Sequence, residues 1–209
     1  LVPKESQDST VQSVRANYRA EFISANYKGW RHLAMTLLLG LGIIALCVYW
    51  LESPTALEWL TVPITFLYSN FAEWAGHKYA MHRPVKGLGF MYKRHSLQHH
   101  RFFTEDNMQI DSTTDFKAVL LPVGIVGAFL VAFFIPVGVF LTWLFSLNVA
   151  LLLIITGMAY YLSYELIHLS YHLKQDHWVH RIPGYTRFAR LHTTHHDHRI
   201  MAHKNFNIT

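Results

Sequence analysis

Long apolar runs separated by polar segments dominate the pattern of the chain. The first run extends from residue 30 to residue 50, and no charged side chain interrupts it between Arg31 and Glu52. A run of this length can cross the hydrocarbon core of a bilayer as a helix. We therefore expect a first membrane span over residues 30–50, followed by a tight turn at Glu52-Ser-Pro54.

A second run, from about residue 56 to residue 82, is more polar than the first. Asn70, Glu73 and His77 step by three and four positions, so in a helix they share one face. Pro84 follows the run, and a proline disfavours helical conformation in the residue before it. The pattern predicts a second span whose polar stripe faces the protein interior.

Residues 117–173 form the longest apolar stretch of the chain, with no basic residue after the first position. As a single helix this stretch would be about 84 Å long, which is far more than a bilayer needs. We therefore expect two antiparallel spans. The turn between them should lie within residues 135–148, where Pro136 and Gly138 break the helical pattern.

The remaining segments are polar and predict a helical cap at the membrane surface. We expect little order in the polar residues 1–9. From Val11 onward, apolar residues at steps of three and four are interleaved with charged ones, which predicts an amphipathic helix along the membrane. We expect one domain with five segments: an amphipathic segment (1–29), spans one and two (30–82), a cap (83–116), spans three and four (117–173) and the rest of the cap (174–209).

The composition places the chain among integral membrane proteins. Hydrophobic residues make up 52% of the 209 positions and charged residues only 15%, which is too apolar for an ordinary soluble domain. The net charge of +5 does not indicate nucleic-acid binding, because the basic residues are interleaved with the spans. The single cysteine, Cys47, rules out an internal disulfide and a cysteine-rich zinc site. The expected fold class is all-α, an integral membrane four-helix bundle with a helical cap.

The distribution of charge predicts the topology. All eighteen Lys and Arg residues fall at or before the start of the first span, between Lys78 and Lys117, or after Leu173. The two opposite loops contain none. Because cytoplasmic loops carry an excess of basic residues, we expect both termini and the cap to lie in the cytoplasm.

Histidines supply the candidate chemistry. Ten of the fifteen fall into four tight groups, and with four spans all of these groups lie at one membrane face. Neutral imidazole is the commonest protein ligand for transition metals, so the groups predict one shared metal site. They are His77 and His82; His95, His99 and His100; His168 and His172; and His192, His195 and His196.

The spacing within the groups suggests how imidazoles converge. The triplet that begins at His192 should share one helix face, as should His168 and His172. His77 and His82 would lie about 140° apart on a regular helix, so they need a local distortion to meet.

We expect His95 and His99 to share a face and His100 to point elsewhere, toward a second ion. Ten imidazoles exceed the coordination of any single ion, so we infer two ions. Zinc, iron, copper and nickel all accept imidazole, and ligand type alone does not name the metal.

A carboxylate-bridged di-iron bundle does not fit the sequence. Glu165 and His168 form one Glu-x-x-His motif, but that architecture needs two such motifs and two further glutamates. Glu73 precedes His77 by four positions instead of three, so the second motif is missing.

The motifs His-x4-His, His-x3-His-His, His-x3-His and His-x2-His-His on membrane helices resemble the fatty acid hydroxylase/sterol desaturase superfamily over roughly residues 66–209. The closing Asn205-Phe-Asn-Ile-Thr209 also looks like this family. The resemblance implies a non-haem di-iron site with all ten histidines as ligands. It also implies an O₂-dependent monooxygenase that attacks an unactivated C–H bond of a fatty acyl or other lipid substrate.

Two alternatives remain open at this point. A lipid or sterol desaturase or oxidase can use the same di-iron site. A membrane metal transporter or sensor is a more remote alternative, because a transporter should carry polar residues along a path across the bilayer. Here the candidate ligands gather at one end of the spans, and their outer halves are apolar apart from Glu58.

The implied reaction needs an electron donor, and the sequence offers no motif for binding a redox cofactor. It contains no haem, flavin or nicotinamide motif, so electrons must come from a separate donor, of cytochrome b5 or ferredoxin type. Glu73 and Glu165 lie one helical turn before candidate ligands. We expect them to accept hydrogen bonds from ligand imidazoles and not to bind iron themselves. Zinc can replace iron in a purified sample.

Overall fold

Helices are the regular secondary structure of the computed structural model, which describes residues 4–203 and 207. The predicted all-α class is confirmed. In chain order the α-helices are α1 (Lys4–Phe22), α2 (Gly29–Tyr49), α3 (Thr61–Ala75), α4 (Gly89–Tyr92), α5 (His100–Phe102), α6 (Phe116–Val119), α7 (Gly124–Phe129), α8 (Ile135–Leu144), α9 (Leu147–Tyr171) and α10 (Tyr185–His195).

Short helices of other types interrupt this series. Three segments are π-helical: η2 (Gly76–Met81), η3 (Lys93–His99) and η5 (Leu130–Phe134). The 3₁₀-helices are η1 (Glu58–Leu60), η4 (Thr113–Asp115) and η6 (Trp178–Arg181). π-helices are rare and often mark functional sites, and two of these three carry candidate metal ligands.

Three helical stretches among the described residues are long and apolar enough to cross a membrane: α2, the stretch Thr113–Leu144, and α9. The first predicted span and the two spans predicted within residues 117–173 each correspond to one of these stretches, and their crossing of a membrane stays a prediction. The predicted second span is not among the three. It consists of η1, α3 and η2, and it remains a predicted span.

The turn between the last two long helices falls after Leu144, inside the predicted window. The prediction that Pro136 and Gly138 break the helix is wrong, because both lie within α8. Pro136 stands in the first turn of α8, directly after the π-helix η5. Gly138 faces α9, and a Cβ there would make an ordinary contact, 3.7 Å from the Cβ of Ala150.

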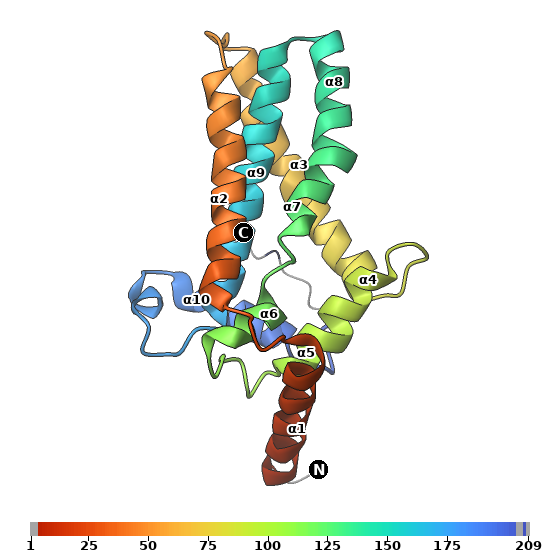
Figure 1. The fold of residues 1–209 in the computed structure, drawn as a ribbon, viewed down its shortest axis with the longest axis vertical. Coiled ribbons are helices and arrows are strands. Elements are labelled where there is room, and N and C mark those ends of the chain that lie inside the picture. The colour runs from red at the N-terminus through yellow and green to blue at the C-terminus, as the bar shows by residue number, and fades with distance from the viewer. Residues whose placement is uncertain (1–3, 204–206, 208–209) are drawn as a thin grey trace. The chain divides into compact units, whose positions relative to one another are not determined.

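The chain forms two compact units. The first, here called the histidine unit, comprises Leu1–Gly29, Glu73–Leu120 and Ile167–Ile208. The second, the apolar unit, comprises Trp30–Ala72 and Leu121–Leu166. The ribbon colours in Figure 1 allow both to be followed along the chain.

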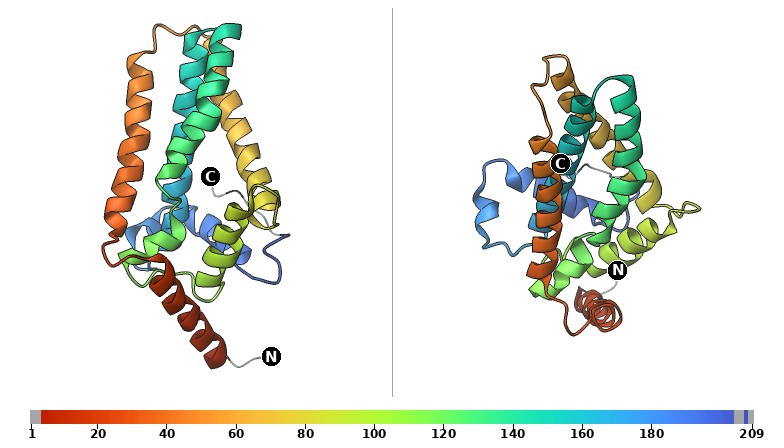
Figure 2. Two further views of the ribbon diagram at one scale, coloured as in Figure 1. Left: turned by 45° about the vertical axis from the view of Figure 1, so that its right-hand side comes forward. Right: turned by 45° about the horizontal axis from the view of Figure 1, so that its top comes forward.

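The apolar unit contains α7, α8 and most of α2, α3 and α9, and the axes of α2, α8 and α9 are roughly aligned (Figures 1 and 2). Its core holds Val126, Phe134, Leu153 and Met158. A Cβ at Gly40 of α2 would lie only 2.7 Å from Leu162 of α9, so glycine permits the close approach of these two helices. Many large apolar side chains of this unit are exposed, as expected of helices that face lipid.

In the histidine unit, α1 packs against α5 through the rings of Tyr18 and Phe102, whose centroids lie 5.3 Å apart. An apolar side chain of α1 thus packs against the protein itself. The position of α1 at a membrane surface stays a prediction. The helix begins at Lys4, and the expectation of little order in residues 1–9 stays a prediction. Residues 1–3, and the closing 205–209 except Asn207, lie outside the described residues.

Candidate metal centre

All ten histidines that the sequence singled out are buried in the histidine unit. Nine of them form two groups in which the ligand nitrogens lie within 4.8 Å of one another. The tenth, His168, joins the second group, because its Nε2 lies 3.2 Å from the Nε2 of His99. The first group is His77, His82, His95, His100 and His195, and the second is His99, His172, His192 and His196 with His168.

The π-helix η2 supplies the distortion that His77 and His82 need. Its i→i+5 hydrogen bonding brings residues five apart toward one face, and the two Nε2 atoms lie 3.3 Å from each other. The sequence-based expectation of a distortion between these histidines is confirmed.

The second π-helix changes the predicted pairing of the next motif. His95 in η3 and His100, the residue directly after η3, are five apart and both enter the first group, whereas His99 enters the second. The prediction that His95 and His99 share a site while His100 serves another ion is therefore wrong. It assumed a regular α-helix, in which residues four apart align.

The triplet on α10 is also divided. His192 and His196 enter the second group, and His195 enters the first. Residues 192 and 196 are separated by about 40° on an α-helix, whereas residue 195 lies about 60° to the other side of 192. The three therefore lie within an arc of about 100°, in line with the expected shared helix face, and from that face they enter two different groups.

Backbone carbonyls orient three imidazoles of the second group. Because a carbonyl oxygen only accepts hydrogen bonds, the Nδ1 atom of each ring must carry the proton. In a neutral ring the Nε2 atom then has a free lone pair, which is the form that binds a metal ion. The Nδ1 of His99 lies 3.0 Å from Ala118 O, that of His172 2.8 Å from Met108 O, and that of His196 2.8 Å from Phe103 O.

A serine plays the corresponding part in the first group. The hydroxyl of Ser96 donates to the carbonyl of Met81 at 2.7 Å, so its only proton is used. The Nδ1 of His82 lies 3.2 Å from the same hydroxyl oxygen and must donate to it. His82 thus also presents an unprotonated Nε2 to its group.

Hydrogen bonding alone leaves the second group unsatisfied. The Nε2 of His192 lies 3.1 Å from the Nε2 atoms of both His172 and His196. Those two atoms have lone pairs, and His192 can donate at most one Nε2–H, to one of them. A lone pair therefore remains directed into a buried cluster of nitrogens, which is the environment that a cation fits.

Protonation does not remove this difficulty. Burial, followed by the neighbouring imidazoles, holds the pKa of His95, His100 and His196 well below the ordinary range. These rings are neutral at pH 7, and metal ions bind neutral imidazole.

The nitrogen spacing also fits metal ligation. With metal–nitrogen bonds of about 2.0–2.1 Å, neighbouring ligand nitrogens lie about 2.9 Å apart at right angles and about 3.3 Å apart in a tetrahedron. Neighbouring Nε2 atoms of the first group are separated by 2.8 Å (His77 to His95), 3.0 Å (His82 to His195), 3.0 Å (His95 to His100) and 3.3 Å (His77 to His82). The two groups adjoin, since the rings of His100 and His196 lie 4.3 Å apart.

Neither acidic residue of the sequence analysis belongs to the two groups. Glu165 is 1% exposed and accepts hydrogen bonds from the backbone N–H of Leu121, at 3.1 and 3.4 Å. Both residues belong to the apolar unit. Glu73 is half-buried in the histidine unit. Whether either carboxylate orients a ligand imidazole stays a prediction.

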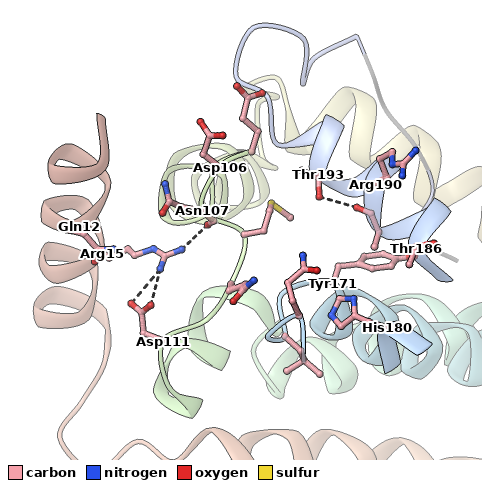
Figure 3. Close-up of a pocket in the computed structure, with 16 residues that line it drawn as sticks. Gln12, Arg15, Asp106, Asn107, Asp111, Tyr171, His180, Thr186, Arg190 and Thr193 are labelled. Atoms are coloured by element: carbon pink, nitrogen blue, oxygen red, sulfur yellow. Dashed lines mark hydrogen bonds and ion pairs between the residues drawn. The ribbon is translucent and has the colours of Figure 1, made fainter. Parts of the chain in front are cut away.

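The other five histidines lie outside the two groups. His32 is hydrogen bonded to the carbonyl of Leu121 at 3.0 Å, and His177 accepts from the backbone N–H of Val179 at the start of η6. His180 lines a cavity of about 690 Å³ beside the second group (Figure 3). The remaining two are His198 and His203.

The cavity is polar and adjoins the second group through two of its residues. The ring of Tyr171 stacks on His192 with centroids 5.1 Å apart, and the carbonyl of Met108 orients His172. An acyl chain does not suit such walls, whereas water or a small polar molecule does. The polar lining includes Gln12, Asn107, Gln109, Gln175, Thr186 and Thr193.

Sequence reasoning missed the groups that orient the ligands. Ser96 could have been noticed, because it stands next to His95 in a histidine motif. The carbonyls of Phe103, Met108 and Ala118 leave no signal in the sequence, because every residue has a carbonyl.

Comparison with family models, with curated proteins and with solved structures gives no significant match. The geometry of the two histidine groups is therefore the basis for assigning a function.

Proposed function

We propose that this chain is an O₂-dependent, non-haem di-iron monooxygenase of the fatty acid hydroxylase/sterol desaturase superfamily. Its substrate is a fatty acyl chain or another membrane lipid, and it hydroxylates a C–H bond. One observation carries the proposal: ten buried histidines form two adjoining groups of converging imidazoles in a chain with three membrane-length helices.

The proposed architecture is a four-helix bundle with a cytoplasmic cap. Residues 56–82 are the second of the four spans, and residues 83–116 and 174–209 form the cap. The basic residues support this side assignment, because Lys and Arg are absent from the two loops at the other ends of the spans. The metal centre then lies at the membrane boundary, where an acyl chain can arrive from the bilayer and electrons from the cytoplasm.

The protein's own residues bind and orient the centre. The first group holds one iron ion and the second group the other, with Ser96 and the three carbonyls fixing ring orientation. Bound iron supplies the activation of O₂ that an inert alkyl C–H bond requires. Burial of all ten imidazoles excludes bulk water from the centre.

The first test is metal analysis of the purified protein after anaerobic loading with iron(II). We expect two iron equivalents per chain. A single equivalent would contradict the two-ion site. Zinc in the protein as purified does not bear on this count, because imidazole ligands accept zinc as well as iron.

The second test identifies the reaction. Lipids of cells with and without the gene are compared, and the reaction is repeated under ¹⁸O₂. Label in a new hydroxyl group supports the monooxygenase. A new double bond without label indicates the alternative, a desaturase or oxidase that uses the same centre.

The third test concerns the electron donor. Each turnover needs two electrons, and we expect a separate donor of cytochrome b5 or ferredoxin type. Sustained turnover by the pure protein with NADPH alone would contradict this expectation.

A further inference from the structure

Arg15 of α1 is buried although it carries a charge, and only 2% of it is exposed. Its Nε donates to the carbonyl of Phe102 at 2.9 Å, and its Nη2 donates to the carbonyl of Asn107 at 2.7 Å. Its Nη1 pairs with the carboxylate of Asp111, at 3.2 and 3.3 Å. Figure 3 shows the guanidinium reaching from α1 to Asn107 and Asp111.

The two carbonyls that Arg15 binds each stand one residue before a carbonyl that orients a histidine. Phe102 precedes Phe103, whose carbonyl accepts from His196, and Asn107 precedes Met108, whose carbonyl accepts from His172. The segment from 102 to 111 is thus fixed on one side by Arg15 and holds two imidazoles of the second group on the other.

The planar guanidinium is suited to this task. Its N–H groups point in fixed directions, so it holds two carbonyls and a carboxylate at once in one arrangement. Lysine has a single ammonium on a flexible stem and cannot reproduce that fork. The rings of Phe102 and Phe103 also lie 4.9 and 5.4 Å from the guanidinium carbon, which fixes the same segment from its apolar side.

We propose that Arg15 is a positioning residue of the second histidine group. It fixes the segment 102–111 so that the carbonyls of Phe103 and Met108 hold His196 and His172 in the Nδ1–H form, with Nε2 directed to the ion. Arg15 does not touch the ion. The inference rests on the proposed metal centre, but its effect on the imidazoles exists in the metal-free protein as well.

Arg19 provides a matched control on the same helix. It lies one turn after Arg15 and is 31% exposed. It pairs with the carboxylates of Asp111 and Asp115 at 2.6 and 2.8 Å, but its hydrogen bonds reach no carbonyl of the 102–111 segment. Substitution of Arg19 therefore removes ion pairs between α1 and this segment and leaves both carbonyl contacts of Arg15.

The experiment compares wild type with Arg15→Lys, Arg15→Gln and Arg19→Gln. Cobalt(II) is titrated into each metal-free protein, and the visible absorption of bound cobalt reports the geometry of each group. For both Arg15 variants we expect one equivalent to bind as in wild type. The other should bind about ten- to a hundred-fold more weakly, as when a partner of a metal-bound histidine is lost, and with an altered spectrum. Arg19→Gln should match wild type.

A second measurement does not depend on metal. The ¹⁵N shifts of histidine side chains in the metal-free proteins report which ring nitrogen carries the proton. In wild type and in Arg19→Gln, His172 and His196 should show the Nδ1–H form. In Arg15→Lys, which keeps the charge beside Asp111, they should show a mixture of both forms.

The outcomes separate the two proposals. If wild type binds no cobalt but the tautomers shift in Arg15→Lys, the metal centre fails and the positioning role stands. If Arg15→Lys keeps the wild-type tautomers and both cobalt equivalents, the positioning role is overturned. The same holds if Arg19→Gln changes the second group as much as the Arg15 variants do, because loss of α1 docking would then explain both.

Discussion

The first and second histidine groups differ in what holds their imidazoles. In the second group, three rings donate to backbone carbonyls of distant segments. In the first group, four of the five rings stand on or directly after the π-helices η2 and η3, and a side chain, Ser96, orients one of them. One group is shaped by the local winding of its helices and the other by tertiary packing.

This difference indicates how each group should respond to change. A group positioned by its own helices depends on a few neighbouring residues. A group positioned by carbonyls depends on every contact that fixes those carbonyls, including ones as far away as Arg15 of α1. The predictions below test whether the two groups are as separable as their contacts indicate.

The largest effect should come from loss of a ligand. His82→Ala should remove the ion of the first group and His172→Ala that of the second, so that each variant retains one iron of two. We expect oxygenase activity to disappear in both, a loss greater than the roughly hundred-fold seen when only a partner of a ligand is removed. Iron analysis and product formation are the measurements, with His203→Ala, an exposed histidine outside both groups, as the control.

The same experiment tests whether the two groups bind their ions independently. If His172→Ala empties both groups, the two ions bind as one cooperative unit, and the comparison between the groups loses its meaning. Wild-type iron content in His82→Ala would instead remove His82 from the ligand set.

The next effect concerns stability. A ligand that binds only the folded state stabilises it by about 2.7 kcal/mol when its free concentration is one hundred times its dissociation constant. Two independent ions should give about twice this gain, and His172→Ala should retain about half of it. The measurement is denaturant unfolding in detergent with and without iron(II). Equal stability of the metal-free and metal-loaded wild type would contradict it.

The sequence was sufficient to find the ten histidines, because histidine pairs at short spacing stand out in a chain with so few polar residues. Apolar run length was likewise sufficient for α2 and α9. The sequence was not sufficient to show that η3 divides its histidines between the two groups. A π-helix leaves no periodic signal over a single turn, so an α-helical reading paired His95 with the wrong neighbour.

Arg15 shows a second limit of sequence reasoning. The pattern of α1 places Arg15 on its polar face. The carbonyls that Arg15 contacts when buried belong to residues 87 and 92 positions further along the chain, and the sequence of α1 gives no sign of them. Glu165 shows the same limit from the other side. A buried acid in a span demands a partner, but the sequence does not say that a backbone N–H, that of Leu121, provides one.

Glu165 gives the third prediction, because it decides whether carbonyls alone orient the second group. It precedes His168 by one turn of α9, and we expect Glu165→Ala to weaken metal binding by about ten- to a hundred-fold. Glu165→Gln should do less damage, since its amide oxygen still accepts a hydrogen bond. The measurement is iron affinity of the second group. Unchanged affinity with a loss of about 1–3 kcal/mol in stability would show that Glu165 stabilises the fold and does not orient a ligand.

Ser96 gives the smallest expected effect and tests the first group alone. Its hydroxyl oxygen is the acceptor for His82 Nδ1, at 3.2 Å, and is itself fixed by donation to Met81. Ser96→Ala removes one hydrogen bond worth about 0.5–1.5 kcal/mol, so iron should bind the first group about two- to twelve-fold more weakly. Ser96→Thr keeps the hydroxyl and should stay closer to wild type.

Ser170→Ala is the matched control, because that hydroxyl bonds to Ile167 and Tyr185 and to no ligand histidine. The measurement is competition with a chelator of known affinity, which resolves such small changes. A larger loss in the second group than in the first would contradict the assignment of Ser96 to the first group.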